Sequence, residues 1–342
     1  MSIYGLPENE ARADGLCTAR VIGQQRGQYR IVTAAGECAA VVSGRLRHEA
    51  LPPSDFPAVG DFVLADMAQG GEAVIRSVLQ RKSSFVRRAA GSARQEQVVA
   101  ANVDTVFLCM SLNRDFSLRR LERDLAVAWE SGASPVVVLT KADLCGDARR
   151  FALEAESVAV GVPVLVTTSL AEDGLAALAL YLRPGRTVAF IGSSGGGKST
   201  MLNRLLGETR QATGGLRGDD RGRHTTTSRE LLPLESGALL LDTPGMREMG
   251  MWDAQEGIDR TFADVRALAA QCRFSDCTHG GEPGCAVQRA IREGGLAPER
   301  LAAFVRLSAE SAYAQDSAGY LAQKERKFKE IAKINKARRS AR

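Results

Sequence analysis

Residues 18–82 carry short apolar runs separated by turn residues. The runs lie at residues 20–22, 29–32, 38–42, 62–64 and 74–79, and several glycines lie between them. Closely spaced short strands without intervening helices are typical of a small antiparallel barrel of about five strands. The segment that follows, residues 81–97, is polar and rich in small residues. We predict that it is a linker or an exposed loop.

A different pattern begins near residue 100. Continuous apolar runs lie at residues 103–109, 136–139, 163–166 and 188–191, and they alternate with segments of helical spacing at 118–129 and 175–182. Solid apolar strands alternating with amphipathic helices indicate a parallel sheet covered on both faces. We therefore predict an α/β domain. The charged, glycine-rich segment 213–226 within it is predicted to be a mobile loop.

The chain beyond residue 251 has a helical pattern. Ile258, Phe262, Val265 and Leu268 fall on one helical face, and a long polar helix is predicted from about residue 298. The chain is thus predicted to be multidomain, with three parts. An OB-like β-barrel, which we expect to be an RNA-binding domain with its linker, occupies residues 1–97, the α/β domain residues 98–253 and the helical domain residues 254–342.

Composition narrows the class of protein. Of the 342 residues 44% are apolar and 25% are charged, the ordinary proportions of a globular protein rather than of a disordered or collagenous chain. No apolar run approaches the roughly 20 residues that span a bilayer. The N-terminal residues lack the basic-then-apolar pattern of a signal peptide. We expect a cytoplasmic protein without a membrane partner.

Charge is concentrated at the C-terminus. Residues 321–342 contain nine Lys and Arg against two Glu, a net +7, whereas the whole chain carries +5 and the other residues therefore sum to −2. A basic tail on a nearly neutral body suggests a polyanionic partner, most simply nucleic acid. The alternative is a solvated tail that only increases solubility.

The strongest chemical signal follows the apolar run at 188–191. It is a phosphate-binding loop pattern and the start of the next helix: Gly192, Ser193, Ser194, Gly195, Gly196, Gly197, Lys198, Ser199 and Thr200. Glycines let backbone N–H groups approach nucleotide phosphates. Lys198 would add charge near the β- and γ-phosphates, and the Ser199 hydroxyl would bind Mg²⁺. A glycine-rich loop without a ligand is the alternative.

A second apolar run, Leu239 to Leu241, ends in Asp242-Thr243-Pro244-Gly245. Asp242 would lie beside Mg²⁺, and the Gly245 N–H would sense the γ-phosphate. A simple turn is the alternative.

The run at 136–139 leads into Thr140-Lys141-Ala142-Asp143, which resembles the guanine-reading Asn-Lys-x-Asp signature of GTPases. Asp143 would accept hydrogen bonds from the N1–H and the exocyclic amine of guanine, and Lys141 would pack along the base. Thr140 replaces the usual Asn, so we expect the bridging role of that residue to be weakened or altered. Thr168 and Ser169 occupy the place of the motif that braces the base from behind. An ordinary exit from a strand into a turn is the alternative.

The order of these motifs is unusual, because the guanine-reading residues precede the phosphate-binding loop. The domain is therefore predicted to be circularly permuted. This order, together with Gly222-Arg223-His224-Thr225-Thr226-Thr227, resembles the ribosome small-subunit-dependent GTPases of the RsgA/YjeQ family. The resemblance implies an OB-fold, a circularly permuted P-loop α/β GTPase domain and a C-terminal α-helical zinc-binding domain.

The resemblance also implies roles in hydrolysis. Thr226 would complete the Mg²⁺ site with Ser199 and Asp242, and Lys198, His224 and Thr226 are the expected catalytic residues. Met246 stands where Ras-like proteins place a water-orienting Gln, and a thioether cannot orient water. Unaided hydrolysis should therefore be slow, and His224 is the candidate group to fold over the γ-phosphate. A structural or merely exposed loop histidine is the alternative.

Three of the seven cysteines form a cluster with a histidine. Cys272, Cys277, His279 and Cys285 provide three thiolates and one imidazole, a complete tetrahedral set for one structural Zn²⁺. The spacing coincides with the zinc domain of the same family. A disulfide and an iron–sulfur cluster are the alternatives, disfavoured by a reducing compartment and by the lack of a fourth cysteine.

These residues together predict a GTPase with GTP or GDP, Mg²⁺ and one Zn²⁺ as ligands, and we expect it to be monomeric. By resemblance, it would act in late maturation of the small (30S) ribosomal subunit, contact its rRNA, hydrolyse GTP to GDP and phosphate when stimulated by the subunit, and then be released. Two alternatives remain open: an RNA-binding scaffold with GDP as a structural ligand, and a permuted GTPase of large-subunit assembly.

Overall fold

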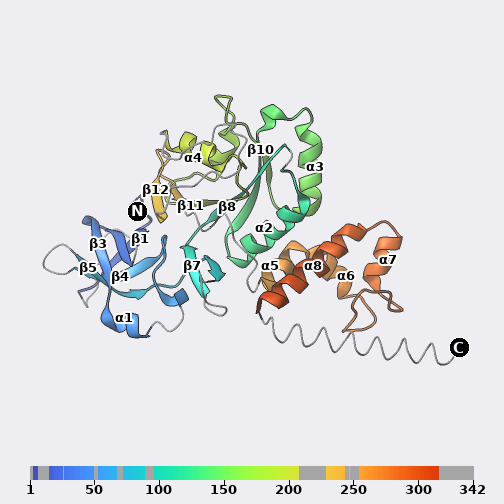
Figure 1. The fold of residues 1–342 in the computed structure, drawn as a ribbon, viewed down its shortest axis with the longest axis horizontal. Coiled ribbons are helices and arrows are strands. Elements are labelled where there is room, and N and C mark those ends of the chain that lie inside the picture. Colours follow the sequence, from blue (N-terminus) through green and yellow to red (C-terminus); the bar gives the residue numbers. More distant parts are fainter. Residues whose placement is uncertain are drawn as a thin grey trace. The chain divides into compact units, whose positions relative to one another are not determined.

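The computed structural model describes residues 3–6, 15–25, 27–49, 53–67, 72–88, 96–113, 115–207, 229–242, 246 and 254–315. The chain divides into two compact units, residues 1–250 and 251–342. Figure 1 shows the elements of both, and each unit is described by itself.

The first unit begins with a closed five-stranded barrel. Its strands are β1 (Cys17–Gln25), β2 (Gln28–Thr33), β3 (Gly36–Val42), β4 (Phe62–Met67) and β5 (Ala73–Val78), with α1 (Gly44–Glu49) and the 3-10 helix η1 (Pro53–Asp55) between β3 and β4. The strand order is β1-β2-β3-β5-β4, and β4 pairs back onto β1. Val21, Ile31, Val63 and Ile75 are buried inside it. This confirms the predicted N-terminal barrel.

Part of the segment predicted as a linker forms a hairpin. Strands β6 (Ser84–Arg88) and β7 (Glu96–Ala101) make a separate antiparallel two-stranded sheet. The segment differs from the expectation because Phe85 is buried despite its polar neighbours, and Val98 and Ala101 pack against Ala58. Gly60 is required at this junction, since a Cβ there would lie 2.1 Å from the Ala101 carbonyl oxygen.

The α/β part of the first unit has a parallel sheet of order β10-β9-β8-β11-β13. The strands are β8 (Thr105–Ser111), β9 (Ser134–Thr140), β10 (Val164–Val166), β11 (Thr187–Ile191) and β13 (Leu239–Asp242). Helices α2 (Leu118–Glu130) and α3 (Ala148–Val158) pack on one face. Helix α4 (Lys198–Leu206) and the 3-10 helix η3 (Ala176–Leu180) pack on the other, where Leu178 and Met201 join Phe107 and Phe190 in one core.

The helix predicted over residues 175–182 is therefore only a short 3-10 helix. Pro184 lies four residues after its last residue, Leu180, and a proline disfavours helical backbone at the residue before it, so a helix cannot continue through Arg183. The remaining short 3-10 helices do not alter the sheet; η2 (Ala142–Leu144) follows β9.

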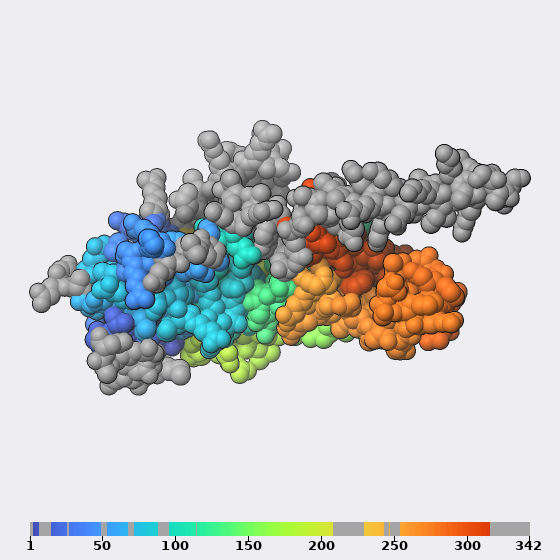
Figure 2. Space-filling view, turned by 90° about the horizontal axis from the view of Figure 1, so that it is seen from below, coloured from blue at the N-terminus to red at the C-terminus, as the bar shows by residue number. Residues whose placement is uncertain are grey.

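One strand links the barrel to the parallel sheet. Strand β12 (Arg229–Pro233) pairs antiparallel with β13 and also with β1 of the barrel. Arg20 reinforces the junction, because its buried guanidinium donates to the Thr187 hydroxyl (2.7 Å) and to the Tyr4 carbonyl (3.0 Å). Burial lowers the pKa of Arg20 to about 10, so it remains charged at neutral pH. In the space-filling view of Figure 2 the blue residues of the barrel lie against the cyan residues that follow them in the chain.

The second unit is helical in its described residues. Helices α5 (Gln255–Thr261), α6 (Ala263–Ala269), α7 (Ala286–Arg292) and α8 (Pro298–Gln315) surround a core that includes Ile258, Phe262 and Leu307. The predicted long helix from residue 298 is present, whereas the predicted face at 258–268 is divided between α5 and α6. Among the described helices of the whole chain, none is long and apolar enough to cross a membrane.

Candidate functional site

The predicted nucleotide-binding residues gather at one edge of the parallel sheet. Strand β9 ends at Thr140, β11 leads into Gly192, and β13 ends at the half-buried Asp242. Because the carboxyl ends of parallel strands meet at the same edge, residues far apart in sequence become neighbours there. The sequence predicted each strand end, and the topology brings these ends together.

The loop after β11 has the backbone of a phosphate cradle. Gly192, Gly195 and Gly197 have φ of 145°, 80° and 84°. A Cβ on Gly192 would lie 2.2 Å from the carbonyl oxygen of Cys109, so only glycine fits there. Gly197 is the N-cap of α4 and provides no side-chain hydrogen bond to the helix. The first-turn N–H groups of α4 can therefore face an anion.

Lys198 lies against this loop. Its side chain is only 8% exposed, and Nζ donates to the Gly192 carbonyl at 2.5 Å and to the Ser193 carbonyl. The ammonium group is thus held within the curve of the loop, beside the start of α4. Ser199 is half-buried, and Ser194 and Thr200 are exposed. A positive charge and helix N–H groups converge here, as phosphate binding requires.

Thr140 bridges the strand and the loop. Its side chain is 3% exposed, and its hydroxyl donates to the Gly196 carbonyl at 2.9 Å. The sequence predicted a weakened or altered bridge at this position because Asn is usual. In the structure a hydroxyl makes a direct bridge from β9 to the loop.

Asp143 and the segment after β10 also come together. Lys141 has a left-handed φ of 59°, and Asp143 follows in η2 with an exposed carboxylate that accepts a hydrogen bond from the Thr168 hydroxyl. The Ser169 carbonyl accepts a hydrogen bond of 2.5 Å from Arg204 of α4. Helix α4 therefore links the glycine-rich loop to the segment that is predicted to recognise the base, a link that the motifs did not predict.

Asp115 contacts the predicted phosphate loop, and the motifs did not predict this contact. It lies in the turn after β8, where its carboxylate accepts a hydrogen bond from the Ser193 hydroxyl and pairs with Arg120 at 3.0 Å. The Asn113 side-chain oxygen accepts from the Asp115 N–H at 3.0 Å and from the Ser111 hydroxyl at 2.9 Å. In the sequence, the feature that could have indicated Asp115 is the polar run directly after the apolar strand.

Three predicted site residues, His224, Thr226 and Gly245, lie outside the described residues. Met246 is described and is 1% exposed. Its thioether is therefore buried.

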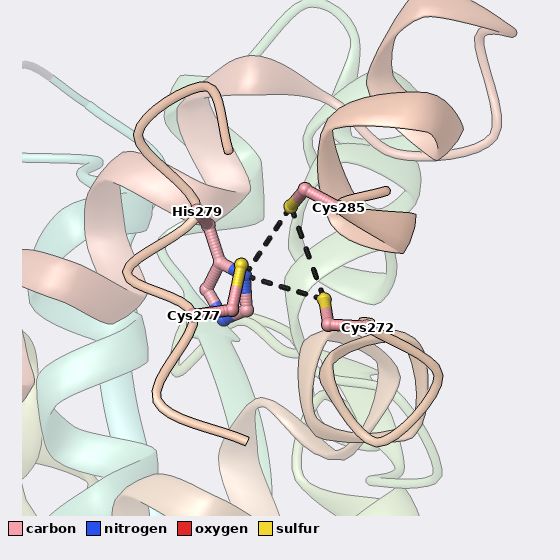
Figure 3. Close-up of side chains that lie close together, drawn as sticks. All are labelled: Cys272, Cys277, His279 and Cys285. Atoms are coloured by element: carbon pink, nitrogen blue, oxygen red, sulfur yellow. Dashed lines mark hydrogen bonds between the residues drawn. The ribbon is translucent and has the colours of Figure 1, made fainter. Parts of the chain in front are cut away.

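The second unit contains a compact cluster of metal-ligating side chains. Cys272, Cys277, His279 and Cys285 point toward one another (Figure 3), and their ligand atoms all lie within 4.8 Å of one another. His279 Nδ1 is 3.7 Å from Cys272 Sγ and 3.5 Å from Cys285 Sγ, and these two sulfurs are 3.9 Å apart. With Zn–S near 2.3 Å and Zn–N near 2.0 Å, a tetrahedral ion places two sulfurs about 3.8 Å apart, and a sulfur and a nitrogen about 3.5 Å apart. The donor set and its spacing fit Zn²⁺.

Glu282 shapes the loop that carries two of these ligands. Its carboxylate accepts hydrogen bonds from the Thr278 hydroxyl and N–H, and from the N–H groups of Gly280 (2.8 Å) and Gly281 (3.1 Å). These bonds, the Thr278 hydroxyl first, lower the pKa of Glu282 to about 2. Hydrogen bonds to the Glu282 carboxylate therefore fix the turn around His279.

Comparison with known proteins gives consistent matches. A model of the family described as RsgA GTPase matches residues 78–252. Small ribosomal subunit biogenesis GTPase RsgA 2 of Lactiplantibacillus plantarum is 48% identical over 304 residues, which cover 88% of this chain and 85% of the relative. The protein of Opitutus terrae named small ribosomal subunit biogenesis GTPase RsgA is 50% identical over 313 residues, 88% of this chain and 85% of the relative.

A solved structure has the same architecture. The crystal structure of YjeQ from Thermotoga maritima superposes with a TM-score of 0.64 at 26% identity, covering 85% of this chain and 97% of that protein. The barrel, the α/β part and the helical part with its cysteine–histidine cluster therefore follow the predicted arrangement, including the permuted order of the motifs.

Proposed function

This chain belongs to the RsgA GTPase family of GTP-hydrolysing enzymes, and from that premise we propose that it acts in late maturation of the small (30S) ribosomal subunit. The subunit would stimulate hydrolysis of GTP to GDP and phosphate, and hydrolysis would release the protein. The observation that carries the proposal is the convergence of the phosphate loop, the Thr140 bridge and Asp143 at one sheet edge. Curated relatives that match most of the chain are named for this process.

We assign the base and phosphate contacts to the residues of that edge. Asp143 would accept hydrogen bonds from the guanine edge, Lys141 would pack along the base, and Thr168 and Ser169 would brace it. The loop amides from Gly192 to Thr200, with Lys198, would bind the phosphates. The positive φ of the three glycines supports this assignment, because a loop that wraps closely around phosphates needs residues that adopt such a backbone.

The metal assignments rest on the donor types. Ser199, Thr226 and Asp242 would hold Mg²⁺, which neutralises charge on the β- and γ-phosphates when bound. The four ligands of the second unit would hold one structural Zn²⁺, because the tetrahedral set leaves no position for substrate.

Hydrolysis needs a group that positions water. Because Met246 is a buried thioether, we assign that role to His224 together with a contribution from the subunit. The Gly245 N–H would contact the γ-phosphate, so that the segment after Asp242 senses its presence. Unaided turnover should then be slow.

The partner proposal extends to RNA. The basic tail, residues 321–342, would contact phosphates of rRNA and add affinity without sequence choice. A small-subunit partner also agrees with the expected cytoplasmic location, which stays a prediction together with the monomeric state and the domain boundaries at residues 97 and 253.

The test is GTP hydrolysis measured with and without purified small subunits. We expect strong stimulation, its loss in Lys198→Ala, and reduced stimulation with unchanged GDP affinity in His224→Ala. Arg149→Ala, an exposed position on α3, is the matched control. An absence of stimulation would favour a scaffold with GDP as a structural ligand. Cosedimentation with large rather than small subunits, in a nonhydrolysable GTP analogue, would favour large-subunit assembly.

A further inference from the structure

A cavity lies at the sheet edge opposite the nucleotide-binding residues. It has a volume of about 450 Å³, and its lining includes the first residues of β8 and β9, the turn at Gly132, and the segment from η3 to β11. Since β8 has seven residues, its two ends are roughly 20 Å apart. The cavity is therefore separate from the phosphate loop. Its size falls within the range of ordinary ligand pockets, about 300–1,000 Å³.

The charge of this cavity is positive. Lys82, Arg183 and Arg186 line it together with a single acid, Asp104. Asp104 is already engaged, because one carboxylate oxygen accepts from Arg186 at 2.9 Å and the other from the Thr187 N–H at 2.8 Å. Lys82 and Arg183 are exposed. Two cationic side chains are thus left over after Arg186 and Asp104 neutralise each other.

The backbone that carries Lys82 is held firmly. Its neighbour Arg81 forms a two-pronged ion pair with the buried Asp61, with both hydrogen bonds at 2.8 Å. The Lys82 N–H donates to the Asn102 side chain at 2.9 Å. Lys82 is therefore presented to the cavity from a firmly held backbone at the junction of the barrel and the sheet.

The polar groups of the cavity suit a phosphate better than a base. Besides its cations it offers the hydroxyls of Thr105, Ser134 and Tyr181, and its one carboxylate is occupied. Cations and hydroxyls are the groups that contact phosphate oxygens, whereas reading a base edge requires acceptors and donors in a fixed pattern. We propose that this cavity binds a backbone phosphate of an RNA strand, as a contact separate from the basic tail and from the nucleotide site; this inference rests on the RNA partner of the proposed function.

The first test is protection of Lys82 from acetylation in the full-length protein, measured by mass spectrometry. The probes are a single-stranded oligoribonucleotide of mixed sequence, and UMP or inorganic phosphate at equal phosphate concentration. We expect RNA alone to protect Lys82. Equal protection by UMP or phosphate would show a site for small anions and overturn the RNA assignment. Equal labelling with and without RNA would overturn the site itself.

The second test is the salt dependence of RNA binding, followed by fluorescence anisotropy. Lys82→Gln/Arg183→Gln removes the two cations that would neutralise this phosphate, so the loss of affinity between 50 and 200 mM salt should shrink by about two- to threefold. Arg119→Gln/Arg149→Gln removes two exposed charges of the same unit elsewhere and is the control. Basal GTP hydrolysis should be unchanged in both variants, which shows that they fold. The same salt dependence in wild type and the cavity variant, or an equal change in the control, would refute the proposal.

Discussion

The bridge between Thr140 and the phosphate loop allows a sharp test of how the nucleotide site is built. Thr140→Val keeps the size and branching of the side chain and removes only the hydroxyl, which donates to the Gly196 carbonyl at 2.9 Å. The position is 3% exposed, so water cannot easily replace the lost donor. Leaving a buried carbonyl without a partner costs about 1–3 kcal/mol.

That cost sets the expected effect on nucleotide binding. If the bridge holds the loop in its binding conformation, GDP affinity should fall by roughly 5- to 150-fold, since about 1.4 kcal/mol corresponds to a factor of ten. The preference for GDP over IDP should not change, because the exocyclic amine that distinguishes them is assigned to Asp143. Thr140→Ser keeps the hydroxyl and should retain most of the affinity.

The measurement is calorimetric titration of GDP and IDP into wild type and both variants, with urea unfolding of each protein as a check on folding. Wild-type affinity in Thr140→Val would refute the view that the bridge organises the loop. If GDP affinity stays at the wild-type value but the ratio of GDP to IDP affinity changes, Thr140 contacts the base instead.

Four further outcomes are expected. Asp143→Asn replaces an acceptor by an amide donor, so GDP affinity should fall at least about tenfold. XDP, which has a carbonyl in place of the exocyclic amine, should bind to the variant more tightly than to wild type in a competition assay. An unaltered GDP preference would contradict the base assignment. Cys277→Ser should lose bound zinc on gel filtration with a chelator and lower the thermal midpoint, whereas Cys38→Ser should do neither. Arg20→Met should lower the free energy of unfolding by about 2–4 kcal/mol in urea, because it leaves buried acceptors unpaired; a loss below about 0.5 kcal/mol would show that the junction does not depend on it. Burial raises the pKa of Asp124 to about 6, so the folded state keeps a proton that the unfolded chain releases near pH 4. The free energy of unfolding should therefore fall by at most about 3 kcal/mol as the pH rises from 4 to 6. If Asp124→Asn shows the same pH dependence, the Asp124 carboxyl is not its source.

The sequence alone determined the elements and most of the candidate chemistry. Apolar periodicity predicted the barrel strands, the parallel strands and α2, because side chains must face a core at a spacing fixed by the backbone. The spacing of Cys272, Cys277, His279 and Cys285 predicted the metal centre, since ligands close in sequence need little help from the fold to meet. The phosphate loop was equally clear, because its glycines meet local backbone requirements.

Only the tertiary structure decided the contacts between distant segments. The pairing of β12 with β1 is long-range. The β6–β7 hairpin is local, but its polar sequence carries no strong period, so the sequence did not predict it. Asp115 beside Ser193 and the link from Arg204 to Ser169 depend on which strands are neighbours. The bridge from Thr140 to Gly196 joins residues 56 positions apart. Local patterns reflect the backbone within a segment, whereas such contacts exist only after the sheet order has placed the strand ends side by side.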